Sequence, residues 1–498
     1  MGGVIGDWGS WILRGVVGFA VFFLTFSWLN HKSAILAAVH EAADSRFSVG
    51  FLAAHVTALA VFALLSSFLY GARLSPLNSD LVVLAWLAAG LSAIVFGGFA
   101  VIGPPLWLRM ARQTGYLWIV TLTAIILACI LGNSSRLLWP WAAGITFRMT
   151  RFLVSPFMPG LIVNSEKLQI GRPRFFVEIA PECSGLEGVG LMLAFGVAWL
   201  ALFRKRCRFP QALLLLPAGA ALIFVLNSVR IAGLILLGNA GAEQIAAGGF
   251  HSQAGWIIFN LVALGFTMAS GSLPWLSKTG GHEPTSGTVE NPTAAWLVPF
   301  IVILAAGMIS RSLTGNFEWL YPLRLLSAAV AIVFFWRRYA SFDWHIDWFG
   351  PVTGVIVFVM WIGLDRFISP GSDAMPAALA TALPLTRNAW LASRVLAAVV
   401  TVPLAEELAF RGFLYRRLIS ADFESVSLRR FSWVALLISS VLFGMLHGSR
   451  WFAGAVAGAL YALVLIRRGR IGDAVAAHAT TNALIAADVL VFHHWNLW

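Results

Sequence analysis

Apolar runs of about 20 residues, separated by short polar segments, recur along almost the whole chain. A run of this length can cross the hydrocarbon core of a bilayer as one helix. The runs lie near residues 11–29, 47–70, 80–102, 115–132, 134–158, 184–203, 210–238, 253–273, 294–311, 319–336, 349–368, 387–405, 407–419, 431–447, 451–466 and 473–492. The pattern predicts an all-α, polytopic bundle of about 13 to 15 transmembrane helices.

One long polar stretch interrupts this pattern and marks a domain boundary. Residues 277–293 are rich in Gly, Ser, Thr and Pro, a composition typical of linkers. We therefore expect two membrane domains, residues 1–275 and 294–498, joined by a linker over residues 276–293. The two domains share no internal repeat, which argues against an inverted-repeat transporter. In the second domain, Gly454 and Gly458 form a small-xxx-small pair that predicts close helix packing.

Composition and charge support the membrane assignment. Apolar residues make up 59% of the 498 residues and charged residues 11%, against about 45–50% and about 25% in soluble domains. The net charge of +12 comes from short basic clusters between apolar runs, as the positive-inside rule requires of cytoplasmic loops. These clusters are at residues 204–208, 337–338, 416–417, 429–430 and 467–470. We therefore expect the lipid bilayer as a partner and no nucleic acid.

A cysteine, an arginine and a histidine form the first candidate site. Pro181 suits the start of a helix and would put Cys183 in its first turn, where a thiol pKa is lowered. Cys183 precedes the basic cluster at 204–208 by 21 residues, about 30 Å of helix, and Arg230 follows the cluster by a similar length. Together with His251, at the start of the next run, they are predicted to meet at the outer membrane face. Singly, each has a structural explanation: core packing, snorkelling to headgroups or helix capping.

The motifs around these residues resemble the exosortases. The resemblance rests on Pro-Glu-Cys-Ser-Gly-Leu at 181–186, Asn-Ser-Val-Arg-Ile at 227–231, and a single His251 after Gly-Gly-Phe. It implies a sortase-like transpeptidation of membrane-anchored proteins that carry C-terminal sorting signals. Cys183 would attack the peptide bond, Arg230 would hold the developing oxyanion, and His251 would serve as acid and base.

The second candidate site lies inside otherwise apolar segments of the second domain. Glu406 and Glu407 are adjacent carboxylates, which are costly in lipid. Glu407 and Arg411 are spaced i,i+4 in the order that favours an ion pair, which leaves Glu406 unpaired. His447 follows in a later run, and His478-x-x-x-Asn482 places an imidazole and an amide on one helix face. Such a set suggests a site where water is activated.

These three motifs resemble the CPBP family of intramembrane proteases related to the CAAX prenyl endopeptidase. The resemblance implies that Glu406 activates water with the help of His447, that His478 and Asn482 stabilise the oxyanion, and that Arg411 orients the glutamates. A divalent metal such as Zn²⁺, held by Glu406, His447 and His478, stays open as an alternative. The chain has no His-Glu-x-x-His helix, so a metal-free glutamate mechanism fits these residues equally well.

The combination of both sites in one chain resembles the exosortase E/protease arrangement. That resemblance implies a multi-pass protein of the bacterial inner membrane and substrates with sorting signals of the PEP-CTERM class, of Val-Pro-Glu-Ile-Asp type. Two other function classes stay open: a transporter whose buried charges line a path, and a non-catalytic membrane scaffold. A transporter predicts internal symmetry and a degenerate scaffold predicts lost motif residues, and the sequence has neither feature.

Overall fold

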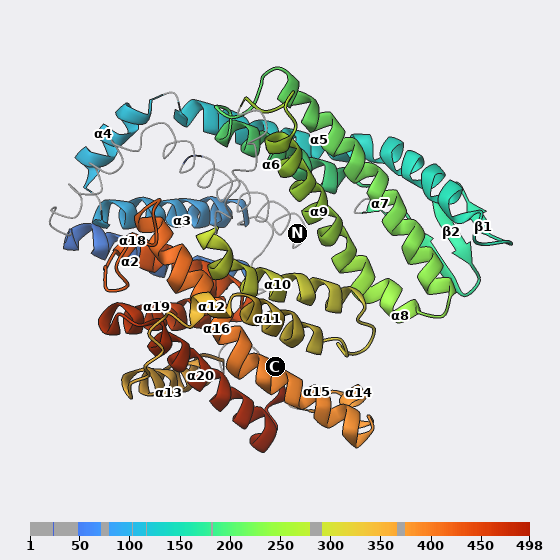
Figure 1. Cartoon of the computed structure of the whole chain (residues 1–498). Helices are drawn as coiled ribbons and strands as arrows, with labels where there is room; N and C mark the ends of the chain where they lie inside the picture. The colour runs from blue at the N-terminus through green and yellow to red at the C-terminus, as the bar shows by residue number, and fades with distance from the viewer. Residues whose placement is uncertain are drawn as a thin grey trace. The chain divides into compact units, whose positions relative to one another are not determined.

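The computed structural model describes residues 23, 48–70, 79–101, 103–115, 117–180, 183–278, 291–365 and 374–498. Apart from residue 23, the expected first span near 11–29 lies outside these residues, as does most of the linker at 276–293. Helix makes up 76% of the structure, which confirms the all-α prediction (Figure 1). The chain divides into two compact units, Met1–Pro140 and Trp141–Trp498, and each is described by itself.

The first unit contains a tight pair of apolar helices. Its elements are α2 (Val49–Tyr70), α3 (Ser79–Val101), α4 (Pro104–Thr114) and the start of α5 (Leu117–Val154). Phe62 of α2 stacks on Trp86 of α3 with ring centroids 4.9 Å apart. Gly90 makes this possible, because a Cβ there would be only 3.1 Å from the Phe62 ring.

The first part of the second unit joins membrane helices to a small sheet. After α5 come β1 (Ile162–Asn164), β2 (Gln169–Arg172), β3 (Phe175–Glu178), α6 (Leu186–Leu202), α7 (Leu215–Asn239), α8 (Glu243–Ile245) and α9 (His251–Ser272). The strands are antiparallel in the order β1-β2-β3. Asn239 Nδ2 donates to the carbonyl of Phe175 at 3.0 Å, and this bond fixes the sheet to the end of α7.

The rest of the second unit is a helical bundle around an aromatic core. Its helices are α10 (Pro292–Ser312), α11 (Pro322–Phe334), α12 (Trp336–Tyr339), α13 (Phe349–Asp365), α14 (Ala377–Ala380), α15 (Pro384–Leu396), α16 (Val402–Glu407), α17 (Arg416–Ile419), α18 (Trp433–Met445), α19 (Trp451–Arg468) and α20 (Ile471–Phe492). Phe443 and Tyr461 are almost completely buried at its centre. A Cβ on Gly454 or Gly458 would press on His447 or Phe443, so the predicted close packing of the glycine pair is confirmed.

The apolar helices are those of a multi-pass membrane protein. Within the described residues, eight helical segments are long and apolar enough to cross a bilayer, and four shorter helices are also apolar. The eight are Val49–Leu69, Val82–Ala100, Gln211–Asn239, Glu243–Ser272, Pro292–Ser312, Pro384–Ile419, Gly448–Arg468 and Ile471–Phe492. Many of their large apolar side chains are exposed in the isolated chain, as expected where lipid is the solvent.

The structure differs from the sequence-based expectation in three places. The two runs at 115–132 and 134–158 form one helix, α5, which continues through Pro140; membrane helices tolerate an internal proline. The runs at 387–405 and 407–419 also form one helical segment, Pro384–Ile419, which contains two π-helical stretches. The strands at 162–178 were not predicted, because each has only three or four residues.

Candidate active sites

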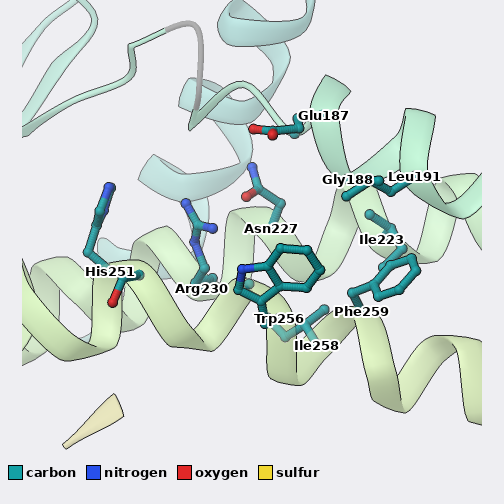
Figure 2. Close-up of a pocket in the computed structure, with 13 residues that line it drawn as sticks. Glu187, Gly188, Leu191, Ile223, Asn227, Arg230, His251, Trp256, Ile258 and Phe259 are labelled. Atoms are coloured by element: carbon teal, nitrogen blue, oxygen red, sulfur yellow. The ribbon is translucent and has the colours of Figure 1, made fainter. Parts of the chain in front are cut away.

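The first site is a pocket of about 240 Å³ lined by residues of α6, α7 and α9. Arg230 of α7 and His251 of α9 both line it, together with Asn227 and Glu187. Figure 2 shows the side chains of Arg230, His251 and Asn227 pointing to the same side of the helices that carry them. Arg230 and His251, 21 residues apart in sequence, therefore meet as predicted.

The Arg230 guanidinium has unused hydrogen-bonding capacity in this pocket. Its Nε atom is buried, and no partner for it occurs among the residues that the structure describes. Gly255, one turn after His251, makes room for the group, because a Cβ there would be 2.7 Å from Arg230 Nη1. A partly buried cation with an unfilled donor beside an imidazole is suited to hold negative charge that develops on a substrate.

Cys183 lies beside this pocket and does not belong to its lining. The expectation that Cys183 occupies the first turn of a helix is wrong. It lies in a short 3-10 turn, and α6 begins only at Leu186. The break comes from Gly185, which caps α6 in the left-handed region at φ 88°, a conformation that favours glycine. Cys183 is 6% exposed. Because it precedes the first residue of α6 by three positions, α6 does not supply the predicted first-turn position.

Asn227 connects Cys183 to the pocket and was missed as a site residue. Its Nδ2 atom donates to the backbone carbonyl of Cys183 at 2.8 Å, while the residue also lines the pocket. Gly185 allows this approach, since a Cβ there would be 3.1 Å from Asn227 Nδ2. Asn227 is three residues before Arg230 on α7 and thus on the same helix face. Its place in the motif at 227–231 was the signal that could have identified it.

The second site is built on the helical segment Pro384–Ile419. Glu406 and Glu407 end the short α16, between π-helical stretches at Ala397–Thr401 and Leu408–Tyr415. Glu407 Oε1 lies 3.1 Å from Arg411 Nη1, and both side chains are almost fully buried. The predicted i,i+4 ion pair is therefore present. Arg411 also donates from Nη2 to the carbonyl of Gly458 at 2.8 Å, which fixes the guanidinium against α19.

His478 of α20 connects the two glutamates. Its Nδ1 atom donates to Glu407 Oε1 at 3.0 Å, and its Nε2 atom lies 3.9 Å from Glu406 Oε2. The His478 ring stacks on the Tyr461 ring with centroids 4.9 Å apart. This stacking fixes the orientation of the imidazole plane. The bond to Glu407 selects the Nδ1–H tautomer when the imidazole is neutral. His478, rather than His447, is thus the histidine placed beside Glu406.

His447 and Asn482 line a second pocket, of about 210 Å³, together with His478. His447 follows the end of α18. That helix begins at Trp433. Its Nδ1 atom lies 3.0 Å from the carbonyl of Phe443. Asn482 donates from Nδ2 to the carbonyl of Ala398 at 2.8 Å. The catalytic roles of both residues stay predictions.

The donor arrangement at the glutamates does not match a metal centre. Throughout the described part of the chain, no three His, Cys, Asp or Glu side chains are grouped so that they could hold one ion. Glu407, a fully buried carboxylate, is engaged by Arg411 and His478. We therefore derive no step through a metal at Glu406, His447 and His478.

Two family models match the chain, and the longer match decides the family. The model described as transmembrane exosortase matches residues 11–268, about half of the sequence. The chain belongs to the transmembrane exosortase family. A second model, type II CAAX prenyl endopeptidase Rce1-like, matches residues 388–484 of this exosortase. No curated protein and no solved structure matches it.

These matches confirm the resemblance found in the sequence: an exosortase fused to a CPBP/CAAX-type protease. The first match contains Cys183, Arg230 and His251, and the second contains all the candidate residues between Glu406 and Asn482. Both are families of membrane peptidases or transpeptidases, so this exosortase is a membrane enzyme of the protease type that acts on protein substrates.

Proposed function

We propose that the chain is a bifunctional peptidase of the bacterial inner membrane. Residues 1–275 would form a cysteine transpeptidase for C-terminal sorting signals, and residues 294–498 a glutamate- and histidine-dependent endopeptidase, joined by the linker at 276–293. The observation that carries the first activity is the pocket shared by Arg230 and His251 beside Cys183. The second activity rests on the position of His478 between the two glutamates.

The first reaction starts from the Cys183 thiolate. Its sulfur attacks the scissile carbonyl carbon, the C–O electron pair moves to oxygen, and Arg230 stabilises the resulting oxyanion with the donors it has unfilled. His251 then gives a proton to the departing amine as the C–N bond breaks, which leaves a thioester on Cys183. An acceptor amine, or water in simple hydrolysis, attacks the thioester and releases the thiol. Asn227 positions Cys183 by donating a hydrogen bond to its backbone carbonyl.

The second reaction needs a water molecule at Glu406. Glu406 Oε2 and His478 Nε2 are 3.9 Å apart, which is too far for a direct hydrogen bond. A water about 2.8 Å from each of these two atoms would fit between them. Glu406 takes a proton from this water while the water oxygen attacks the carbon of the peptide carbonyl. Glu406 later gives the proton to the leaving amine. Asn482 would hold the oxyanion, and His478 would donate to it from Nε2 when that nitrogen also carries a proton. Glu407 and Arg411 keep the His478 ring in place.

Processing of a tagged membrane protein that ends in a Val-Pro-Glu-Ile-Asp-type sorting signal tests the first activity. The assay is run in a Glu406→Gln background, and mass spectrometry identifies the new C-terminus. Cys183→Ser should abolish processing, because serine lacks thiolate character. His251→Ala should slow it by about 10²–10⁴-fold. Cys207→Ser is the matched control, since Cys207 is also buried and does not line the pocket. Undiminished processing by Cys183→Ser would rule out a cysteine transpeptidase.

The second activity is tested in the reciprocal background. With Cys183 replaced by Ser, any remaining cleavage of co-expressed membrane proteins is compared with and without Glu406→Gln. This substitution keeps the side-chain shape and removes the base, so cleavage should stop while the protein stays folded and inserted. Full cleavage by the Glu406→Gln variant would show that another group activates water.

A further inference from the structure

An arginine that the catalytic scheme does not use lines the pocket of the second site. Arg394 is near the end of α15 and shares the pocket with His447, His478 and Asn482. Its Nε atom is buried without a hydrogen-bond partner, and no carboxylate within the described residues forms an ion pair with it. The described lining of the pocket also contains no Asp or Glu. Arg394 lies within the helical segment Pro384–Ile419, which is long and apolar enough to cross a bilayer. An arginine in such a segment without an ion-pair partner among the described residues points to function.

Aromatic rings hold the Arg394 guanidinium in place. It lies 4.3 Å from the ring centroid of Tyr321 and 5.5 Å from that of Trp498. Tyr321 has a second arginine nearby, Arg324, at 4.8 Å from the same ring. Arg324, however, is ion-paired with Glu318. Two arginines thus share one aromatic ring, and only Arg394 lacks an acidic partner among the described residues.

The pocket runs from Arg394 toward the glutamates along one helix ridge. Arg394, Ala398 and Val402 all line it, and they are spaced four residues apart, as side chains on one ridge are. The next position on that ridge is Glu406, whose carboxylate is near His478. Twelve residues separate Arg394 from Glu406, on the order of 18 Å of helix. A fully extended peptide covers this length in about five residues.

We propose that Arg394 binds a carboxylate of the peptide that the second site cleaves, about five residues from the scissile bond. This inference rests on the proposed endopeptidase function and specifies its substrate class. The carboxylate would accept hydrogen bonds from Nε and one Nη of Arg394, a bidentate geometry that lysine cannot reproduce. The carboxylate belongs to the peptide C-terminus or to an acidic side chain, and the experiment separates these two sources.

The test uses three internally quenched apolar decapeptides and the full-length Cys183→Ser protein in detergent micelles. The first peptide has a free C-terminus, the second is its C-terminal amide, and the third is the amide with one Glu four residues from the end. Initial cleavage rates give kcat and KM for Arg394→Gln, Arg394→Lys and the control Arg324→Gln. Binding of the same peptides to the Glu406→Gln variant, with and without Arg394→Gln, is measured by fluorescence polarisation.

We expect one carboxylate peptide to have a KM at least about tenfold below that of the amide without a Glu, the loss of one good charged contact being of this order. Arg394→Gln should remove that preference, Arg394→Lys should restore part of it, and Arg324→Gln should keep it. The preferred peptide identifies the source of the carboxylate. An equal fall in kcat/KM on all three peptides in the Arg394→Gln variant would overturn the proposal.

Failure of the endopeptidase function itself has a different outcome. If no peptide is cleaved in a Glu406-dependent way, the proposed function fails, and the binding measurement still decides about Arg394. Equal affinity for the acid and amide peptides would then reject carboxylate recognition. Tighter binding of a carboxylate peptide that disappears in Arg394→Gln would support it independently of cleavage.

Discussion

Replacing Glu407 by Gln should destabilise the protein strongly, because it leaves Arg411 charged and buried. Arg411 is 1% exposed and Glu407 is fully buried, so water cannot take over the lost contact. Breaking a buried pair from one side costs about 3–5 kcal/mol. Arg411 keeps its bond to Gly458 and its position 4.2 Å from the Phe443 ring centroid. We therefore expect about 3 kcal/mol, the low end of that range, or roughly 10²-fold in the unfolding equilibrium.

The free energy of unfolding can be measured by circular dichroism as SDS is titrated into mixed micelles. Glu406→Gln is the matched control, since it makes the same chemical change one residue earlier without removing the ion pair with Arg411. It should cost less than about 1 kcal/mol. The double variant Glu407→Gln/Arg411→Met should recover part of the loss, because it removes the stranded charge. If Glu407→Gln is as stable as Glu406→Gln, the ion pair does not have the role assigned to it.

Three further predictions concern topology, packing and the thiol site. In a cysteine-free background, Lys167→Cys should react with an impermeant maleimide from the periplasm and Lys205→Cys only after permeabilisation; the opposite pattern would invert the assigned orientation. Gly458→Ala should lower the free energy of unfolding by about 1–3 kcal/mol, since its Cβ would be 3.1 Å from the Phe443 ring. Gly363→Ala, with nothing within 4 Å, should not lower it. Asn227→Ala should slow sorting-signal processing at least about tenfold, and an unchanged rate would remove its positioning role.

Thiol labelling of the natural cysteines would be a poor test of topology. Cys207 is 1% exposed, and burial raises the pKa of its thiol above the usual value although Lys278 partly opposes this. Little reactive thiolate is therefore available at neutral pH. We expect Cys207 to stay unlabelled from both sides, which is why the exposed Lys167 and Lys205 positions are preferred.

The sequence predicted those features that depend on local spacing. Apolar run length placed most helices, and the i,i+4 rule predicted the contact between Glu407 and Arg411. The meeting of Arg230 and His251 followed from topology, because each lies one span away from a basic cluster. These inferences needed only helix geometry and the preference of basic loops for one membrane side.

The remaining features depend on contacts that sequence spacing does not determine. The break before α6 comes from the left-handed Gly185. The φ angle of a glycine in an apolar segment cannot be predicted from the sequence. Asn227 and Tyr461 acquire their roles from partners 44 and 17 residues away, Cys183 and His478. Such pairings are decided by how helices pack. The same holds for Arg394, which in the sequence is a single basic residue within the apolar run at 387–405.

The π-helical stretch at Ala397–Thr401 has a consequence for how this site can change in evolution. A π turn is equivalent to one extra residue inserted in an α-helix, and here it lies between Arg394 and Glu406. Removing one residue from it would restore regular α-helix and rotate one half of the segment by about 100° against the other. The pocket-lining ridge would then no longer lead to the carboxylate. A single-codon deletion that touches no reactive side chain should therefore disconnect substrate recognition from cleavage, so the length of this stretch is under the same constraint as the glutamates themselves.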